Sequence, residues 1–347
     1  MRFRIRHSKP TISAAELKAV SKVLKSSYVA SGKVTENFQK TFKKIIKVNF
    51  ALATNSGTSA LHLALLALKI KRGDEVVIPS YVCSAVLNAV LYTGAKPKIA
   101  DINLFDFNLS LKDTKRLISR KTKAIILSHM FGKPADIRSL LKLGVPIIEN
   151  CAQSLGALYK GRPTGSFGDV SVFSFYATKL ITTGYGGMIC SKNNNLVKIA
   201  EDLINFDERK DYKIRYNYKM SDVAACLGIS QLKQLKSFIS KRREIASYYN
   251  KGLKSNKVLL PEDKEKNHIY FRYVVRVEKG IDRVIGVLNN KGIEAKKPVF
   301  KPLHHYLKLD RKKFPNTEAV FNSAISLPIY PGLRMAEAKY IVQALNR

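Results

Sequence analysis

The stretch Val170-Ser171-Val172-Phe173-Ser174-Phe175-Tyr176-Ala177-Thr178-Lys179 decides how the chain is interpreted. Apolar or aromatic residues alternate with small or polar ones as far as Phe175, which is typical of a half-buried β-strand. The strand is predicted to end in a turn that carries Lys179. The next run, Ile181 to Cys190, is predicted to be a second strand, interrupted by Gly186-Gly187.

A lysine at the mouth of two buried strands is unusual, because an ammonium group is costly to bury without a partner. Burial or a nearby cation lowers the pKa of a lysine and makes it a usable amine nucleophile and Schiff-base former. Taken alone, Lys179 is better explained as one of the many solvated lysines of this chain. Two further stretches favour a functional role.

The second stretch is Ala53-Thr54-Asn55-Ser56-Gly57-Thr58-Ser59, which precedes the helix-forming run Ala60 to Leu68. Its hydroxyl residues can cap the helix. A helix N-terminus with free backbone N–H groups is also a ready site for a phosphate. An ordinary cap before a core helix would explain the same residues.

The third stretch runs from Val145 to Ser154, where an apolar strand delivers Glu149, Asn150 and Gln153 at its carboxyl end. In open parallel sheets, ligands bind at that edge. The alternative is a polar turn after a buried strand. Because neighbouring residues of a strand point to opposite faces, Glu149 and Asn150 are not expected to face the same site.

In this order, the three stretches resemble the DegT/DnrJ/EryC1/StrS family of sugar aminotransferases, over nearly the whole chain. Further matching motifs are Gly73 to Ser80, His129 to Asp136, Asn217 to Asp222 and Ser326 to Pro328. The family consists of pyridoxal-phosphate enzymes of the type I, aspartate aminotransferase fold. The resemblance implies pyridoxal 5'-phosphate as cofactor and transfer of an amino group, with glutamate as donor, to a keto sugar linked to a nucleotide.

The resemblance also assigns residues to the cofactor. Lys179 would bind it covalently and then move the substrate proton as a general acid–base. Its phosphate would be held by Ser56, Gly57, Thr58 and Ser174, and Gln153 would lie beside its ring and 3-hydroxyl.

Three further residues are assigned to the substrate or to a neighbouring subunit. Asn217 would reach the phosphate of the partner's cofactor, which implies a homodimer with shared active sites. His304 and Tyr81 would lie on the substrate side. Without the resemblance, Asn217 is equally explained as a turn residue and His304 as a surface histidine.

The chain departs from the family pattern at three positions. Cys83 stands where many members have an aromatic residue that stacks on the cofactor, and Tyr81 is a candidate to compensate. Lys219 replaces an arginine and loses its planar fork. Asn150 replaces an aspartate whose charge favours the protonated pyridine nitrogen. A neutral amide cannot supply that attraction, so we expect a working but slowed aminotransferase.

Between residues 75 and 190, short apolar strands alternate with helices. This alternation predicts an α/β fold with a mostly parallel central sheet flanked by helices. We expect a large cofactor-binding domain over residues 1–245 and a smaller C-terminal α+β domain over residues 246–347. Six strands are predicted at 76–78, 98–100, 124–127, 146–148, 170–175 and 188–190. Helices are predicted at 14–25, 34–46, 221–254, 281–290 and 335–346, and a strand at 268–277.

Composition narrows the class of protein. The 347 residues carry a net charge of +35, but the basic residues are spread along the chain and no nucleic-acid motif accompanies them. Nucleic acid is therefore not an expected partner. Four widely spaced cysteines without a CxxC pair predict neither a metal site nor a disulfide framework. No apolar run is long enough to span a bilayer, and the basic start lacks the apolar core of a signal peptide. We expect a cytoplasmic protein.

Other functions remain open at this point. A cofactor-binding regulator without turnover is motivated by Asn150. A sugar dehydratase of the same fold is disfavoured, because by resemblance that branch replaces the lysine with histidine and this chain has Lys179. A nucleic-acid-binding protein is motivated by charge alone.

Overall fold

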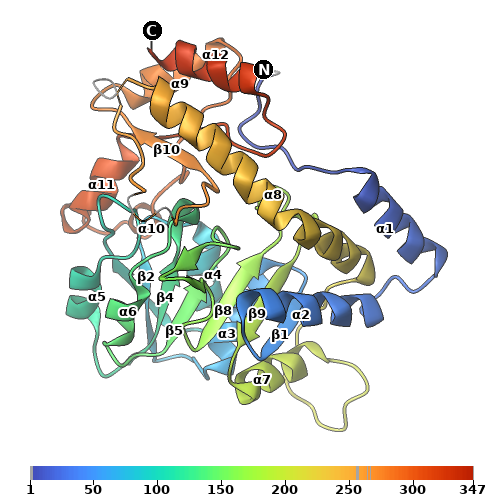
Figure 1. The fold of residues 1–347 in the computed structure, drawn as a ribbon. Helices are drawn as coiled ribbons and strands as arrows, with labels where there is room; N and C mark the ends of the chain where they lie inside the picture. Colours follow the sequence, from blue (N-terminus) through green and yellow to red (C-terminus); the bar gives the residue numbers. More distant parts are fainter. Residues whose placement is uncertain (1–2, 255–257, 264, 266, 347) are drawn as a thin grey trace.

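The computed structural model describes residues 3–254, 258–263, 265 and 267–346. Its centre is a seven-stranded sheet in the order β1-β9-β8-β5-β4-β2-β3 (Figure 1). The strands are β1 (Phe50–Thr54), β2 (Glu75–Pro79), β3 (Lys96–Ala100), β4 (Thr122–Ser128), β5 (Ile147–Asn150), β8 (Val170–Ser174) and β9 (Gly187–Ser191).

The sheet is mostly parallel, as the sequence predicts. Strands β3, β2, β4, β5 and β8 run parallel to one another, whereas β9 is antiparallel to both β8 and β1. The carboxyl ends of β2, β4, β5 and β8 therefore lie along one edge. All six predicted strands overlap strands of this sheet.

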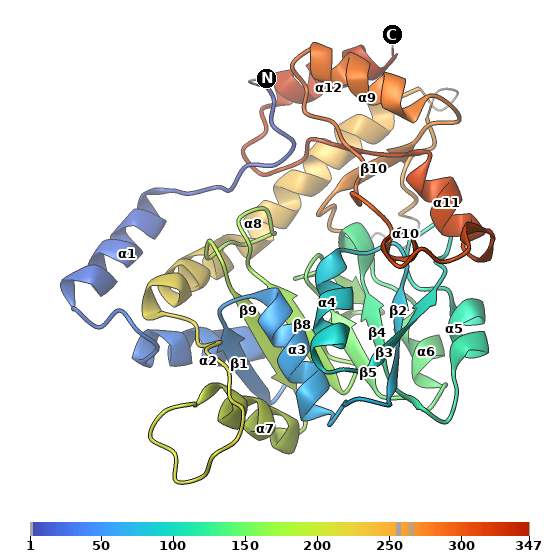
Figure 2. The ribbon, with the colours of Figure 1, turned by 180° about the vertical axis from the view of Figure 1, so that it is seen from behind.

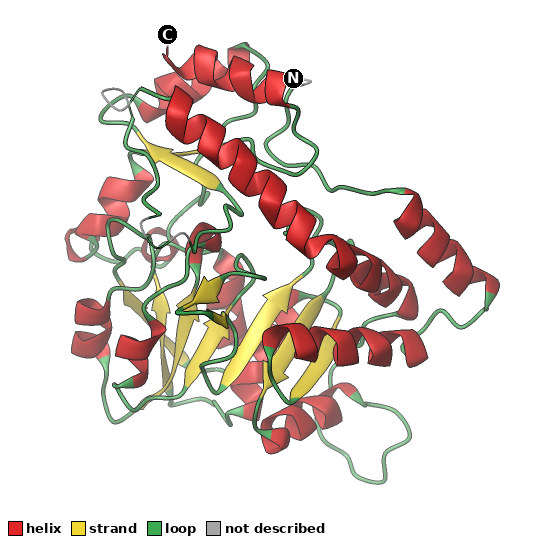
Figure 3. Ribbon diagram, in the orientation of Figure 1, coloured by secondary structure: helices red, strands yellow, loops and turns green. Residues whose placement is uncertain are grey.

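Helices cover both faces of the sheet (Figures 2 and 3). They are α1 (Ala14–Lys25), α2 (Lys33–Ile46), α3 (Gly57–Ala67), α4 (Ser84–Tyr92), α5 (Leu111–Leu117), α6 (Ile137–Leu141), α7 (Asn194–Ile204) and the long α8 (Asp222–Gly252). Helices α3, α4 and α7 share one apolar core with the sheet, and α2 and α8 share another on its opposite face.

The side chains of successive residues in the central strands point to opposite faces of the sheet. Ile126 and Ile148 pack in the core with α3 and α4, while Ile125 and Ile147 pack with α6. All four are fully buried. Burial on both faces explains why these strands are continuous apolar runs rather than alternating ones.

The C-terminal part has its own core. The part contains a two-stranded sheet of β10 (Tyr273–Arg276) and β11 (Ala324–Leu327), and the helices α9 (Ile281–Asn290), α10 (Leu303–Tyr306), α11 (Pro315–Phe321) and α12 (Met335–Asn346). Helices α9 and α12 pack in its own core, whereas Leu303 of α10 and Val320 of α11 pack in the core of the large sheet. Short pieces complete the secondary structure: β6 (Leu158–Tyr159), β7 (Arg162–Pro163), η1 (Met130–Gly132) and η2 (Arg311–Lys313).

Helix α8 runs continuously past the proposed domain boundary at residue 245 (Figure 1). Leu235 and Phe238 belong to the core under the large sheet, whereas Ile245 and Tyr249 belong to the C-terminal core. Ile5 also packs in the C-terminal core. We retain the division into residues 1–245 and 246–347 as a proposal, with the first residues of the chain attached to the smaller part.

Three sequence predictions need correction. The run Ile181 to Cys190 is a strand only from Gly187, in β9, and residues 181–186 form an irregular turn. Strand β1 was not predicted, although it forms the edge of the sheet beside β9. The predicted strand at 268–277 is a strand only from Tyr273 to Arg276, because Tyr270 has a left-handed backbone with φ +49° that cannot belong to a strand. No helix within the described ranges is both long enough and apolar enough to cross a membrane.

Candidate active site

A cavity of about 250 Å³ lies at the carboxyl ends of β5 and β8 and the start of α3. Eight residues predicted for the cofactor line it: Ser56, Gly57, Thr58, Cys83, Asn150, Gln153, Ser174 and Lys179. They come from four separate stretches of the chain. The sheet brings these stretches together, because the carboxyl ends of its parallel strands meet at one edge.

Lys179 lies in the turn after β8, where its backbone N–H donates to the carbonyl of Tyr176 at 2.8 Å. The side chain is half-buried, and its Nζ lies 5.3 Å from the centre of the Phe271 ring. Burial and the positive charge of Arg272 lower the pKa of Lys179 from 10.5 to about 8. A substantial fraction of the amine is therefore neutral, and thus nucleophilic, near physiological pH.

The start of α3 packs directly against Ser174. Ser56 caps the helix by accepting from the N–H of Ser59 at 3.0 Å. The N–H groups of Gly57 and Thr58 stand in the first turn and have no partner within the helix. A Cβ on Gly57 would lie 2.8 Å from the Cβ of Ser174, so only glycine permits this approach. Two free N–H groups and two hydroxyls thus meet at one end of the cavity.

Asn150 and Glu149 point to opposite faces, as the strand geometry predicts. Asn150 lines the cavity, accepts from the N–H of Ala152 at 3.2 Å and donates to Ser128 Oγ at 3.1 Å. Because a backbone N–H can only donate, the contact with Ala152 fixes which amide atom is oxygen.

Glu149 is wholly buried beneath the cavity wall. Its carboxylate accepts from His129 at 3.0 Å and from three backbone N–H groups of residues 165–168. Burial favours the neutral acid, but the hydrogen bonds from His129 and from the backbone outweigh it and lower the pKa of Glu149. Glu149 is thus an ionised anchor for a loop, and it leaves the cavity to Asn150.

Gln153 is oriented by a single hydrogen bond. Its Oε1 accepts from the N–H of Phe131 at 2.9 Å, so its Nε2 is the amide atom left to act as a donor. Phe131 can present its N–H in this way because it adopts a left-handed conformation with φ +57°. The structure thus predicts that Gln153 meets a ligand as a donor.

The cavity also has lining residues that the sequence did not single out. Tyr176 and Tyr185 line it, are 43% and 69% exposed, and pack edge to face at 5.3 Å. Tyr176 lies within the opening stretch and Tyr185 precedes Gly186, so proximity to those motifs was the available signal. Cys83 lines the cavity as an exposed free thiol at the start of α4.

Three predicted residues do not line the cavity. Asn217 is exposed, and its carbonyl accepts from Asn55 Nδ2 at 3.0 Å. Tyr81 is fully buried, and its hydroxyl has no hydrogen bond of standard geometry to any residue that the structure describes. His304 is also fully buried. Its Nδ1 bonds to Ser80 Oγ at 2.5 Å and its Nε2 to Glu318 at 2.8 Å.

Comparison with known proteins identifies the family. Residues 10–346 match the model of the DegT/DnrJ/EryC1/StrS aminotransferase family. The chain belongs to this family. It is 35% identical over 351 residues to GDP-perosamine synthase of Escherichia coli O157:H7, covering 97% of this chain and 96% of that protein. It is 34% identical over 358 residues to GDP-perosamine synthase of Vibrio cholerae, covering 97% of both.

Solved structures agree with this assignment. A Streptococcus pneumoniae protein assigned as a sugar aminotransferase, in its PMP form, superposes with a TM-score of 0.94 at 26% identity, covering 99% of this chain and 98% of that one. Helicobacter pylori PseC, an aminotransferase involved in the biosynthesis of pseudoaminic acid, superposes with a TM-score of 0.90 at 25% identity, covering 99% and 98%. The predicted type I fold is confirmed.

The chain is a pyridoxal-phosphate-dependent sugar aminotransferase, which confirms the predicted enzyme class and cofactor. The cavity suits the cofactor on this chain's own geometry. The α3 start, with its spare N–H groups and Ser174, is suited to a phosphate. The neutral fraction of Lys179 is suited to an aldehyde. Asn150 and Gln153 present oriented amides between these two ends.

Proposed function

We propose that this chain transfers an amino group from glutamate to a keto sugar carried on guanosine diphosphate. Relatives named GDP-perosamine synthase support the nucleotide, because they match at 33–35% identity over at least 97% of this chain. The observation that carries the proposal is Lys179, a half-buried amine with a pKa near 8, in one cavity with a phosphate-type helix start.

Each side chain of the cavity has a role in this proposal. The bound cofactor supplies the electron sink for the reaction. Gly57, Thr58 and Ser174 would hold its phosphate. Gln153 would act as a donor to its ring through Nε2. Lys179 anchors the cofactor at rest, and its freed amine then carries the proton to and from the substrate carbon.

Asn150 sets the charge at the far side of the ring in this proposal. Its amide can accept from a protonated ring nitrogen or donate to an unprotonated one. It has no negative charge with which to favour protonation. Asn150 would therefore hold a ring nitrogen less fully protonated than an aspartate would, and we expect slower proton removal from the donor.

The proposal includes a homodimer in which Asn217 reaches the partner's cavity. The segment that carries Asn217 is held against the start of α3 by the N–H of Asn55, which donates to the carbonyl of Tyr218 at 2.8 Å. The side chain of Asn217 nevertheless stays exposed and outside its own cavity. This arrangement suits a contact with a second copy of the chain.

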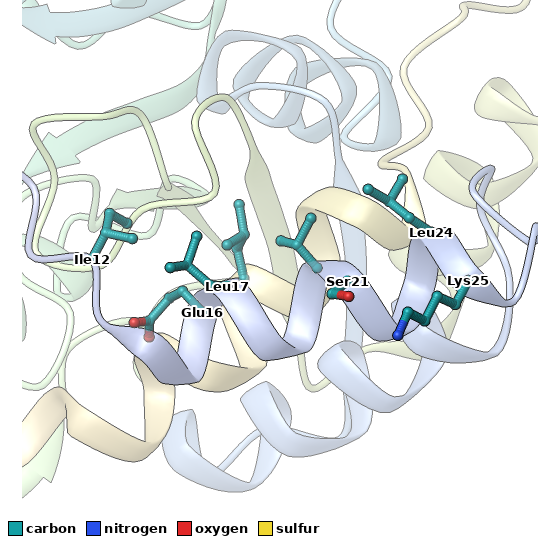
Figure 4. A pocket seen from close by; sticks show the side chains of 8 residues that line it. Ile12, Glu16, Leu17, Ser21, Leu24 and Lys25 are labelled. Carbon is teal, nitrogen blue, oxygen red and sulfur yellow. The ribbon is translucent and has the colours of Figure 1, made fainter.

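An apolar groove on α1 supports the same assembly (Figure 4). Glu16 attaches α1 to α8 by accepting from Ser230 at 2.8 Å and from Gln234 at 2.7 Å. This polar anchor leaves Leu17 and Leu24 exposed by 68% and 55%. Side chains of that size gain stability when a second copy covers them.

A cytoplasmic location is part of the proposal. It is supported by the cysteines, since all four are free thiols.

The product assay tests the proposed reaction. Purified protein is incubated with glutamate and a panel of nucleotide-linked keto sugars, and amino sugars are detected by mass spectrometry. We expect product with the GDP-linked sugar and a loss of at least ~1,000-fold for Lys179→Ala, since both the anchor and the proton carrier are removed. Lys198→Ala, on α7, is the control. Product from other nucleotides alone would reject the guanosine assignment, and no amino sugar at all would reject the function.

Subunit exchange tests the shared site. Lys179→Ala and Asn217→Ala are each expected to be inactive, and mixing them is expected to restore part of the activity, because one cavity of the mixed dimer has both residues. Exchange is followed by native mass spectrometry. Demonstrated exchange without any recovery of activity would show that the sites are not shared.

A further inference from the structure

Arg272 precedes β10 and is tied to the wall of the cavity. Its backbone N–H donates to the carbonyl of Phe131 at 3.3 Å, and the N–H of Phe131 donates in turn to Gln153. A parallel contact joins the N–H of Ile269 to the carbonyl of Gly132 at 3.1 Å. Phe131 therefore orients Gln153 through its N–H and positions the segment that carries Arg272 through its carbonyl.

Gly132 makes this attachment close. A Cβ at this position would lie 2.7 Å from Ile269 Cγ1 and 2.9 Å from the backbone nitrogen of Phe271, and the backbone has φ +96°. Only glycine permits both the conformation and the approach. The segment 269–272 is thus held in a defined position beside Lys179.

The guanidinium of Arg272 lies near the reactive amine. Its Cζ is 5.8 Å from the centre of the Phe271 ring, and Lys179 Nζ is 5.3 Å from the same centre. Burial and then the charge of Arg272 lower the pKa of Lys179, and the charge of Arg272 also opposes the rise that burial causes in the pKa of Tyr81. The two cations thus lie beside one aromatic ring, so Lys179 Nζ and Arg272 Cζ are at most about 11 Å apart, although Arg272 is not itself among the residues that line the cavity.

This guanidinium lacks a counter-ion. It is half-buried, and within the ranges that the structure describes it makes no side-chain hydrogen bond and no ion pair. Burial lowers the pKa of Arg272, which reflects the cost of holding the charge there. The buried hydroxyl of Tyr81 is likewise without a hydrogen bond of standard geometry to the described residues. Burial raises the pKa of Tyr81, against the lowering effects of the Arg272 charge and of the Val299 main chain.

We propose that Arg272 binds a carboxylate of the amino-acid donor. The planar guanidinium fork matches a carboxylate bidentately, and the pair offsets the cost of a half-buried cation. The other anion of the site, the cofactor phosphate, has its own cradle at the start of α3. This inference rests on the proposed function and adds a donor-selecting residue that the cofactor motifs do not contain.

The test measures binding without turnover. The cofactor-loaded protein is reduced with borohydride, which fixes the cofactor on the lysine, and is titrated calorimetrically with glutarate, a dicarboxylate that has no amino group to transfer. Guanosine diphosphate is titrated separately. The variants are Arg272→Gln, Arg272→Lys and, as a control with the same change of charge at an exposed position of α9, Arg283→Gln.

We expect Arg272→Gln to weaken glutarate binding at least tenfold, which corresponds to about 1.4 kcal/mol. Arg272→Lys keeps the charge but loses the fork, so its affinity should lie between those of the wild type and Arg272→Gln. Arg283→Gln should bind like the wild type. Binding of guanosine diphosphate should be unchanged in all variants.

A second readout does not depend on the donor. Without Arg272 the pKa of Lys179 should rise, so capture of pyridoxal phosphate by the apoprotein should shift to higher pH in Arg272→Gln and stay in place in Arg272→Lys.

Three results would overturn the inference: wild-type affinity for glutarate in Arg272→Gln, no glutarate binding by the wild type, or loss of guanosine diphosphate binding in its place. Failure of the proposed function would look different, because the wild-type protein would then form no amino sugar from glutamate in the product assay, whatever the effect of Arg272→Gln on glutarate binding.

Discussion

Two polar clusters follow strand β2 within a few residues of each other, and they differ in how completely they are hydrogen-bonded. Ser80 leads to a cluster with His304, His305 and Glu318, in which both ring nitrogens of His304 have partners and both histidines contact Glu318. Cys83 lines the cavity that contains Lys179. Lys179 in this cavity, and Arg272 behind its wall, have no counter-ion within the described residues, and the first turn of α3 has N–H groups without a partner in the helix.

We interpret the fully hydrogen-bonded His304 cluster as structural and the incompletely hydrogen-bonded Lys179 cavity as a ligand site. Buried polar groups are nearly always hydrogen-bonded, so groups left without partners require an explanation. In the His304 cluster the protein supplies the partners itself, and Phe314 stacks on the His304 ring at 4.3 Å. In the Lys179 cavity we assign the missing partners to cofactor and substrate. Residue type alone does not distinguish the two.

The largest expected effect is the pH dependence of cofactor capture by Lys179. The pKa of Lys179 is lowered from 10.5 to about 8, and only the neutral amine reacts. The neutral fraction of such a group rises about fifty-fold between pH 6 and pH 8, so capture should accelerate over that range and level off above it. Absorbance during mixing of the apoprotein with pyridoxal phosphate measures the rate, and a lysine-containing peptide corrects for titration of the cofactor itself.

The free energy of unfolding of the apoprotein should also depend on pH because the pKa of Lys179 is lowered in the folded chain. Between pH 8 and pH 10.5 the unfolded chain still binds the proton that folded Lys179 has released, so this residue makes the free energy of unfolding rise with pH across that window.

A rate of cofactor capture that keeps rising towards pH 10.5 would mean that Lys179 is an ordinary solvated lysine. The cavity would then not differ from an exposed surface in its effect on the pKa of a lysine.

Replacing Asn150 by aspartate sharpens the account of the cavity. The new carboxylate can keep the hydrogen bond from Ala152, and the hydroxyl of Ser128 can turn to donate to it. We expect single turnover with glutamate to accelerate about tenfold, which corresponds to about 1.4 kcal/mol of barrier, because the ring nitrogen becomes more fully protonated. Stopped-flow absorbance measures it.

Asn150→Ala is the matched control, since it removes the amide without adding charge. An Asn150→Asp variant that binds the cofactor and gains no speed would show that the departure from the family aspartate does not limit the reaction.

The smallest effect on turnover is expected in the other cluster. Glu318→Gln removes the charge that both histidines contact, so we expect the free energy of unfolding to fall by about 1–3 kcal/mol. Turnover per folded molecule should change less than twofold. Urea unfolding and the product assay measure the two quantities. A large loss of turnover with unchanged stability would assign this cluster to the substrate, as the family resemblance implies for His304.

The sequence predicts the parts of the site that follow the strand ends. Ser174, Asn150 and Gly57 lie at ends of elements whose periodicity is clear, so their convergence follows from the parallel sheet. The sequence did not predict a role for Arg272, because that role depends on the left-handed backbone of Phe131 and on the absence of a counter-ion among the described residues. Both are properties of the folded chain.

The burial of His304 and Tyr81 could not be predicted either, since it depends on packing of the C-terminal part against the turn after β2. Strand β1 was missed for a related reason. Phe50 to Thr54 is short and rich in alanine, and its strand conformation is fixed by pairing with β9, which lies far along the chain.

The most direct test of the central claim is to find which lysine takes the cofactor. Protein loaded with pyridoxal phosphate is reduced with borohydride, digested and mapped by mass spectrometry. The account predicts one pyridoxyl group, on Lys179, and its absence in Lys179→Ala while Lys198→Ala keeps it. A pyridoxyl group on another lysine, or none on Lys179, would contradict the account.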